Sequence, residues 1–312
     1  MIASDRLDAL DPGRVVTCPD GSVDEFVHVH DAAGRVTDRA AFGRRIADGE
    51  RSYRFVPQRR APGGQSVTAA RQAHALGAEV TLFGHCDGPL FEFPFDVHSL
   101  GSPAEVTVCT FPGSDLMFAT DGPDLADCDA ALLREAGAYD APADAVVVAN
   151  AVSVPSVDDV LRGFGADDAP VVFDPGPIMG IGVDRAVALR DALGSLAERR
   201  PVVVSPNREE TRAFAGALGI EGPAALRDAL GVVAVVVHSN PKTTVATADG
   251  TVDIDTPDVE RVGRTGGGDC FVGALATALS SGWSVREASE LGVICATHRV
   301  GTNEIGDRET LR

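Results

Sequence analysis

Short apolar runs alternate with amphipathic stretches along most of this sequence. The apolar runs are rich in valine, are bounded by turn residues, and cover residues 14–17, 79–83, 143–149, 170–173, 201–204 and 232–237. Stretches with helical periodicity cover residues 66–76, 157–162, 184–198, 208–217, 270–281 and 285–299. Apolar strands that alternate with helices are typical of a doubly wound α/β fold with a mostly parallel sheet.

Two stretches interrupt this alternation. Residues 26–58 and 99–119 contain turn residues and strand-like alternation, with little helical periodicity. We expect them to form a second, smaller antiparallel sheet. Beside a doubly wound core, such a sheet could cover a ligand at the carboxyl ends of the core strands.

The composition narrows the functions that the chain can have. It has 312 residues, 44% of them hydrophobic, and 46 acidic residues against 27 basic ones, for a net charge of −19. Such a charge repels nucleic acid and anionic lipid, so we expect neither as a partner. Lys242 is the single lysine, and the acidic composition resembles that of halophilic proteins; a GC-rich genome that encodes Arg in place of Lys is a compatible explanation.

The same composition argues against a membrane or secreted protein. The sequence has no apolar run near the roughly 18–20 residues of a membrane span and no apolar signal segment at its start, so we expect a cytoplasmic protein. The cysteines form no CxxC pair, which predicts buried free thiols and no zinc site. They are Cys18, Cys86, Cys109, Cys128, Cys270 and Cys295.

The segment Gly266-Gly267-Gly268-Asp269 leads directly into the helical stretch at 270–281. Backbone N–H groups at a helix N-terminus bind anions, and glycine lets a phosphate approach them closely. A carboxylate in the first turn can take a proton from an attacking hydroxyl while the amides stabilise a moving phosphoryl group. The alternative is a glycine-rich turn in which Asp269 only caps the helix, and the segment alone leaves both interpretations open.

A second glycine segment, Pro62-Gly63-Gly64-Gln65, stands before the helical stretch at 66–76. Its free amides could recognise a hydroxyl or a carboxylate, although a simple N-cap by Ser66 is an alternative explanation.

A third polar segment follows the strand at 201–204. Asn207 and Glu210 are three residues apart and share one face of a helix, where they could hold a hydrated Mg²⁺ near phosphates. A capping box between the two residues is the better interpretation from the sequence alone. Asn150, at the end of the strand at 143–149, is a further candidate for a substrate contact.

The order of these segments resembles that of the ribokinase-like (PfkB) family of carbohydrate and nucleoside kinases, from about residue 15 to residue 301. The resemblance implies a single domain over residues 1–312, with a three-layer α/β/α core, a mostly parallel sheet and a small β lid. It also implies transfer of a phosphoryl group from ATP, with Mg²⁺, to a hydroxyl of a sugar or sugar derivative. It further implies a homodimer formed through the lid strands.

The same resemblance assigns roles to individual residues. Asp269 corresponds to the catalytic base, and the anion hole corresponds to Gly266, Gly267 and Gly268. The sugar would contact Asp24, Gly63, Gly64, Gln65 and Thr68. The nucleotide and Mg²⁺ would be organised by Asn207, Glu210, Ser239, Asn240 and Thr265. No protein side chain is assigned as a direct metal ligand.

Two departures from the family pattern leave alternatives open. Gly263 replaces an Asp associated with a monovalent cation and Arg264 replaces a Thr, which makes activation by potassium doubtful. The usual glycines after the strand at 232–237 are replaced by Ser239-Asn240, so nucleotide preference is open. A non-catalytic sugar- or nucleotide-binding regulator on the same scaffold is therefore one alternative.

A nucleoside kinase on the same fold is the other alternative. An aromatic stacking residue in the lid would favour it, and the candidates are Phe26, Phe55 and Phe118. A P-loop kinase is excluded because the sequence contains no GxxxxGK[ST] motif. The scattered histidines His85, His98, His238 and His298 suggest no site of their own.

Overall fold

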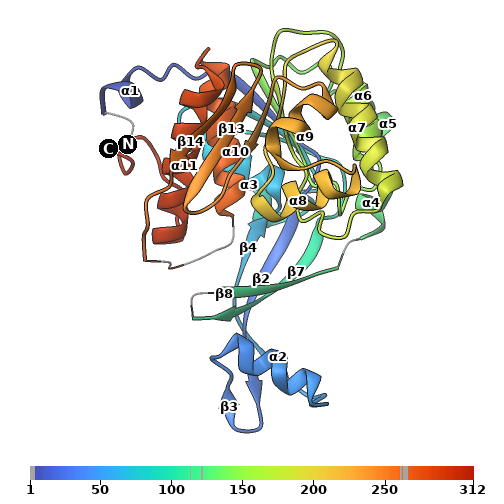
Figure 1. Ribbon diagram of the computed structural model, residues 1–312. Coiled ribbons are helices and arrows are strands. Elements are labelled where there is room, and N and C mark those ends of the chain that lie inside the picture. The colour runs from blue at the N-terminus through green and yellow to red at the C-terminus, as the bar shows by residue number, and fades with distance from the viewer. Residues whose placement is uncertain (1–3, 113, 121, 261, 263–265) are drawn as a thin grey trace.

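The computed structural model describes residues 4–112, 114–120, 122–260, 262 and 266–312. Within these residues the strands of the larger sheet follow the order β14-β13-β12-β11-β10-β9-β1-β5-β6 (Figure 1). Their bounds are β1 (Arg14–Cys18), β5 (Glu79–Gly84), β6 (Asp96–Ser99), β9 (Ala145–Ala149), β10 (Val171–Asp174), β11 (Val202–Val204), β12 (Ala234–Val237), β13 (Lys242–Thr247) and β14 (Gly250–Asp255).

Parallel pairing dominates this large sheet. All pairs from β12 to β6 are parallel, and only the hairpin of β13 and β14 adds antiparallel strands. The six strands predicted from apolar runs are all present, which confirms the doubly wound fold. The sequence patterns did not predict β6, β13 or β14, since the edge strands β6 and β14 are mostly exposed and β13 is only partly buried, so none of them has a continuous apolar run.

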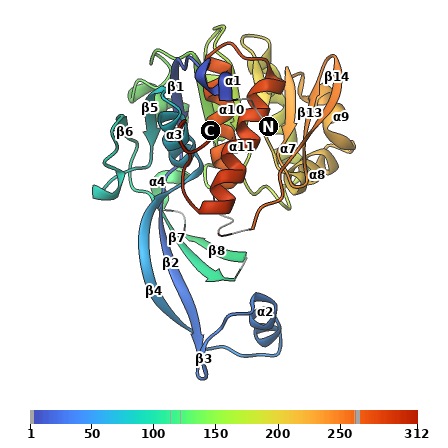
Figure 2. The ribbon, with the colours of Figure 1, turned by 90° about the vertical axis from the view of Figure 1, so that its left-hand side faces the viewer.

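Helices cover both faces of the large sheet (Figures 1 and 2). One face packs on α1 (Ser4–Asp8), α3 (Gln65–Ala75), α10 (Gly267–Ser280) and α11 (Val285–Thr302). The other packs on α5 (Ala130–Glu135), α6 (Val157–Gly163), α7 (Val183–Ala197), α8 (Arg208–Ala217) and α9 (Gly222–Leu230). The six predicted helices are confirmed, whereas α1, α5 and α9 are additional.

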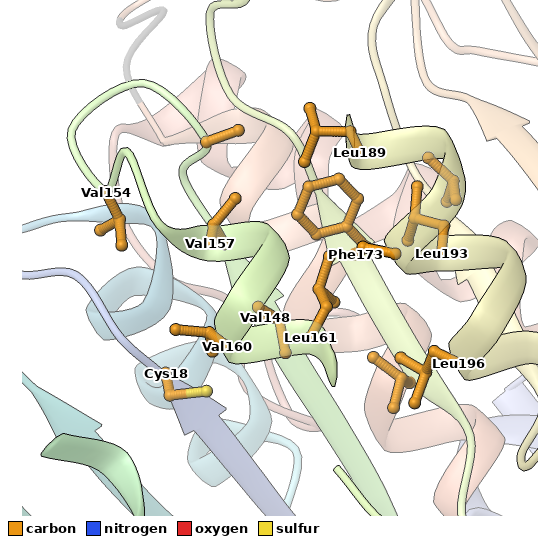
Figure 3. Close-up of a cluster of buried hydrophobic side chains, with 14 of the residues drawn as sticks. Cys18, Val148, Val154, Val157, Val160, Leu161, Phe173, Leu189, Leu193 and Leu196 are labelled. Carbon is orange, nitrogen blue, oxygen red and sulfur yellow. The ribbon is translucent and has the colours of Figure 1, made fainter. Parts of the chain in front are cut away.

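The position of strand β9 in the sheet explains why all of its residues are apolar. Val148 points into the cluster with α6 and α7, where Leu161 and Leu193 lie beside Phe173 of β10 (Figure 3), and Val146 belongs to the same cluster. Alternate residues of the same strand point to the opposite face and pack against α3 and α10. Because both faces are covered, every residue of β9 is buried, as expected for a central parallel strand.

A smaller sheet extends away from this body (Figures 1 and 2). It contains β2 (Ser22–Asp31), β3 (Gly34–Arg35), β4 (Arg54–Gly63), β7 (Ala104–Phe111) and β8 (Ser114–Thr120). We call it the small sheet. It carries α2 (Arg39–Ala47) near its far end, and the short elements η1 (Pro89–Phe91) and α4 (Pro123–Ala126) lie in neighbouring connections.

The small sheet differs from the expectation in two respects. It is not wholly antiparallel, because β2 and β7 pair in parallel. Both strands follow parallel strands of the large sheet, β1 and β6, and leave it at the same edge and in the same direction. The second difference is α2, which lies within a stretch expected to form only strands. Phe42 is its one buried residue, so its helical pattern is weak.

All six cysteines are buried free thiols, as predicted. In the part of the chain that the structure describes, no helix is both long and apolar enough to cross a bilayer.

Helices α3 and α10 approach each other closely at Gly273. A Cβ on Gly273 would lie 2.4 Å from the backbone oxygen of Ala69 and 2.9 Å from its Cα. Backbone atoms cannot move aside as a flexible side chain can, so only glycine permits this contact. The contact sets the distance between the two helices, whose N-termini both open toward the same edge of the sheet.

We expect Gly273→Ala to lower the free energy of unfolding by about 1–3 kcal/mol, the usual cost of overpacking. The matched control is Gly216→Ala in α8, where a Cβ has no neighbour within 4 Å. That change should raise stability by about 0.4–1 kcal/mol through the unfolded state. Urea denaturation of both variants tests the contact, and equal effects of the two substitutions would contradict it.

Candidate active site

A cleft with a volume of about 1200 Å³ lies between the small sheet and the carboxyl ends of the large-sheet strands. A smaller cavity of about 260 Å³ lies beside α10 and α11. His238 and Gly268 line both of them. The two cavities therefore meet at the N-terminus of α10.

The start of α10 combines amides and a carboxylate at this junction. Gly266 is the N-cap residue, with φ +81°, a left-handed conformation that favours glycine, and Asp269 lies in the first turn. The first N–H groups of a helix have no acceptor within the helix and carry partial positive charge. Gly266, Gly268 and Asp269 all line the cleft. The structure thus brings an amide cluster and a carboxylate together at one point.

The Asp269 carboxyl stands in a crowded group of acids. Burial raises its pKa well above the ordinary value, and repulsion from Asp174, Asp20 and Asp24 raises it further. Arg299, which lines the same cleft, opposes the shift. A carboxylate with a raised pKa is a stronger proton acceptor once it is ionised.

Asp174 and Glu210 extend this acidic group. Asp174 ends β10, is 3% exposed and accepts a hydrogen bond of 3.0 Å from the Gly176 amide. Burial raises the pKa of Asp174, and the charge of Glu210 adds to the shift. Burial likewise raises the pKa of Glu210, with a further contribution from Asp269. The mutual repulsion of Asp174, Glu210 and Asp269, which Arg299 offsets only at Asp269, favours a positively charged ligand at this position.

Asn207 and Glu210 form the capping box of α8, as the sequence predicted. The Asn207 side chain accepts from the amides of Glu209 and Glu210, and Glu210 Oε2 accepts from the Asn207 amide at 2.8 Å. Both residues also line the cleft. Capping and a role at the ligand are therefore compatible.

Asp20 is a site residue that the sequence analysis missed. It follows β1 and accepts hydrogen bonds from the amides of Gln65 at 3.0 Å and Ser66 at 2.7 Å, so it caps α3. The Asn150 side chain donates to the same carboxylate at 2.9 Å. Ser66 is thus not the N-cap; Gly64 holds that position without a capping side chain of its own. An acidic residue directly after the first parallel strand was the available signal.

Asp24 lies across the cleft on β2. Ser22 Oγ donates to its carboxylate at 2.7 Å, and a Cβ on Gly63 would collide with that carboxylate at 2.3 Å. Burial raises the pKa of Asp24. Gly64, Gln65 and Thr68 line the same cleft. All five residues predicted to contact a sugar are therefore neighbours in space.

The remaining predicted residues divide into two groups. Ser239 and Asn240 line the smaller cavity with Gly267. Thr265, together with the departures at Gly263 and Arg264, lies outside the described residues.

Arginines, which the sequence analysis did not single out, also reach the cleft. Arg59 lies 3.5 Å from the centroid of the Phe26 ring, and Arg71 and Arg299 lie on α3 and α11. Burial lowers the pKa of Arg71, and the nearby charge of Arg299 lowers it further. Guanidinium groups beside carboxylates suit a polyhydroxylated ligand that both accepts and donates hydrogen bonds.

Comparison with known proteins identifies the family. The model of the prokaryotic ketohexokinase family matches residues 4–312. The chain belongs to this family. It is 28% identical to a ketohexokinase of Haloferax volcanii, over 97% of this chain and 91% of that protein. The family is one of carbohydrate kinases, and this chain is a carbohydrate kinase that phosphorylates a sugar.

Solved structures agree on the fold. A ribokinase from Thermotoga maritima superposes with a TM-score of 0.69 at 19% identity, covering 96% of this chain and 98% of that one. A fructokinase with bound ATP from Xylella fastidiosa gives a TM-score of 0.65 at 15% identity, with 95% and 96% covered. A nucleoside kinase from Methanocaldococcus jannaschii gives 0.68 at 15% identity, again with 95% and 96% covered. The ribokinase-like fold is thus established.

The acidic group makes a testable prediction about pH. Because the pKa of Asp174 is raised in the folded state, that state holds its proton to higher pH than the unfolded chain. Its stabilising contribution is complete below the ordinary carboxyl pKa near 3.9 and is lost as pH rises through the folded value. Asp174→Asn removes the titration and retains an acceptor for Gly176.

We therefore expect Asp174→Asn to be more stable than the natural protein at about pH 9, by at least about 1.4 kcal/mol, the equivalent of one pKa unit. The difference should shrink toward about pH 4. Denaturant unfolding in concentrated KCl without Mg²⁺, at several pH values, measures it. Parallel stability curves for the two proteins would contradict the assignment.

Proposed function

We propose that the protein transfers the γ-phosphoryl group of ATP to a hydroxyl of a ketohexose. The position of Asp269 carries this proposal, since it lines the larger cleft next to Gly268, where the two cavities meet, and lies in the first turn of the helix whose amides face the same point. A sugar in the larger cleft and a nucleotide in the smaller cavity would approach each other there.

On the acceptor side, the sugar would lie between Asp24 of the small sheet and Asp269 of α10. Asp269 accepts the proton of the attacking hydroxyl as the new O–P bond forms. The bond between the γ-phosphorus and the β–γ bridging oxygen breaks, and its electron pair leaves with ADP. The amides of Gly266, Gly267 and Gly268 stabilise the charge on the equatorial oxygens during transfer.

On the donor side, the smaller cavity supplies an apolar surface for a planar base. Its walls include Pro257, Val259, Val293 and Val300, and Ser239 and Asn240 stand at its polar end. An apolar slot with a few polar groups suits a nucleobase and its ribose. Phosphates that leave this cavity at Gly268 would reach the N-terminus of α10 directly.

The acidic group fits a hydrated Mg²⁺ better than a cage of protein ligands. Among the described residues, no three His, Cys, Asp or Glu side chains are arranged to hold a metal. Glu210 accepts a hydrogen bond from Asn207, and Asp174 accepts one from Gly176. Because an ionised carboxylate has about four acceptor sites, each side chain can also accept hydrogen bonds from metal-bound water. Mg²⁺ commonly keeps several waters and binds phosphate oxygens. Bound there, it would neutralise phosphate charge, and Asp174 and Glu210 would orient its water shell.

The small sheet is suited to act as a lid over the cleft. Strand β2 places Asp24 and Phe26 on the face toward the cleft, and Met117 of β8 lines the same face. Val27 and Val29, on the other face of β2, pack against α2 instead. A lid that closes on the sugar would expel water, which strengthens the electrostatic interactions with the phosphoryl group.

The aromatic residues favour a sugar over a nucleoside as acceptor. Of the three stacking candidates, only Phe26 lines the cleft, and Arg59 lies over its ring at 3.5 Å. Phe55 and Phe118 are exposed and contribute nothing to the cleft. A nucleobase would have to displace the Arg59 guanidinium before it could stack on that face of Phe26.

A substrate panel tests the acceptor class. With ATP and Mg²⁺ in concentrated KCl, we expect D-fructose to show a kcat/KM at least about tenfold above those of aldohexoses and adenosine, within the range that pocket contacts achieve. Phosphorus NMR of the product would identify the phosphorylated hydroxyl. Preference for adenosine would support the nucleoside kinase instead, and sugar binding without transfer would support the non-catalytic regulator.

Substitution of the base tests the mechanism. Asp269→Asn should reduce kcat by at least about a hundredfold, since it removes a positioned proton acceptor. Sugar binding should persist, and the melting temperature should rise, because one of several crowded carboxylates becomes neutral. Steady-state kinetics and thermal unfolding measure these effects. An unchanged kcat would remove Asp269 from the mechanism.

A further inference from the structure

His238 occupies the junction of the two cavities, although no sequence motif points to it. It follows β12 and lines both the cleft and the smaller cavity. A Cβ on Gly268 would lie 2.9 Å from His238 Nε2, so this ring nitrogen faces the start of α10. A β-bridge pairs His238 with Asn207, and the His238 amide donates to Pro206 at 3.1 Å. The imidazole thus stands between the two helix N-termini that face the phosphate path.

The other ring nitrogen is held by Ser205. Its hydroxyl lies 3.3 Å from His238 Nδ1, and the serine is fully buried. A neutral imidazole has one donor and one acceptor nitrogen. If the Ser205 hydroxyl donates to Nδ1, the proton of the ring is on Nε2, the nitrogen that faces Gly268. A partner at one nitrogen of a histidine commonly sets the role of the other.

Phe271 fixes the plane of the ring. Its side chain is stacked with His238 at 5.3 Å between centroids and 28° between planes, and it is itself 1% exposed. Because Phe271 belongs to α10, the helix that begins at the glycines also orients the imidazole. The direction of Nε2 is therefore coupled to the direction of the helix amides.

We propose that His238 donates a hydrogen bond from Nε2–H to the phosphoryl group during its transfer, in the tautomer that Ser205 holds. The proposal rests on the proposed function and adds to it a side-chain donor beside the Gly266–Gly268 amides. No proton moves in this step: His238 remains neutral, and the proton of the sugar hydroxyl still passes to Asp269. A donor aimed at developing negative charge stabilises the transition state more than the ground state.

The surroundings of the ring agree with a neutral donor. Burial lowers the pKa of His238 to about 4. The ring is therefore uncharged at neutral pH, and one hydrogen-bond donor is available at every working pH. Asn207, which pairs with His238 in a β-bridge, and Gly268 of α10, whose backbone faces Nε2, line the cleft beside it.

Two substitutions of His238 separate the donor from the volume of the ring. His238→Leu removes both nitrogens, and we expect kcat to fall about a hundredfold, the cost of losing one donor to an oxyanion. His238→Gln places an amide N–H near the position of Nε2, and kcat should stay within about fivefold of the natural value, since a neutral donor is retained. The KM for the sugar should change little in both.

Ser205→Ala tests the tautomer. In the natural background, kcat should fall roughly three- to tenfold, the equivalent of one neutral hydrogen bond. In the His238→Gln background the same substitution should have no further effect, because glutamine has no tautomer to fix. An effect purely on packing would be equal in both backgrounds. The double-mutant cycle therefore distinguishes a positioning role of Ser205 from a structural one.

The matched control is His74→Leu. His74 lies in the last turn of α3, where its ring contacts Phe95 at 5.3 Å between centroids, away from the cleft. Its kcat should equal that of the natural protein. Thermal unfolding of every variant identifies losses that come from unfolding, and comparisons are then made at a temperature where all variants are folded.

Three results would overturn the proposal. They are a kcat of His238→Leu equal to that of His74→Leu, a loss of kcat in His238→Gln as large as in His238→Leu, and an effect of Ser205→Ala on kcat that is undiminished in the His238→Gln background.

If the natural protein transfers phosphate to no sugar, the proposed function fails by itself. The contact is then judged by calorimetry with ATP and ADP: His238→Leu should lose any preference for ATP, and a retained preference would refute the contact.

Discussion

The close packing of α3 against α10 is the contact on which the site depends. Gly273 lets the backbone of α10 rest against Ala69 of α3, so the two helix N-termini open side by side at the carboxyl edge of the sheet. One end receives the Asp20 cap and faces Asp24, and the other carries Gly266, Gly268 and Asp269. A bulkier residue at this contact would separate the acceptor side from the phosphate side by displacing a whole helix.

The charges of the site residues determine which ligands this geometry can bind. Asp20, Asp174, Glu210 and Asp269 gather at one edge of a chain whose net charge is already −19. Burial of like charges costs free energy that a hydrated divalent cation and the helix amides can offset. In the proposed mechanism, a cation bound near Asp174 and Glu210 and a phosphate at the amides would therefore both stabilise the site. Burial and the same crowding raise the pKa of Asp269, so its ionised form is a stronger proton acceptor.

Several polar side chains around the site hold other site residues in position through hydrogen bonds. Asn150 holds Asp20, Asn207 holds Glu210, and Ser205 contacts His238. The small sheet adds Asp24 and Phe26 from outside the body and has its own apolar cluster beneath α2. That cluster is separate from the two core clusters of the body, into which only the near ends of the sheet pack, through Val23 of β2 and Ala104 of β7. A sheet attached at one end in this way suits the lid role proposed above.

Local sequence patterns were sufficient to predict six strands of the large sheet and the order of the motifs. Continuous apolar runs such as β9 have no other stable location than between two helical layers, and the glycine segments before α3 and α10 can be recognised locally. Tertiary structure alone decided which polar residues meet. Asp20, Asp174 and His238 each stand at the end of an apolar strand, but long stretches of chain separate them from one another and from Arg299, so no local pattern shows that they meet. Pairing in register brings the ends of β1, β10 and β12 to one edge, while α2 and the parallel pairing of β2 with β7 depend on contacts distant in sequence. Local patterns predict which residues are buried and where the chain turns. The site, in contrast, consists of residues that are distant in sequence and that only the packing of the folded chain brings together.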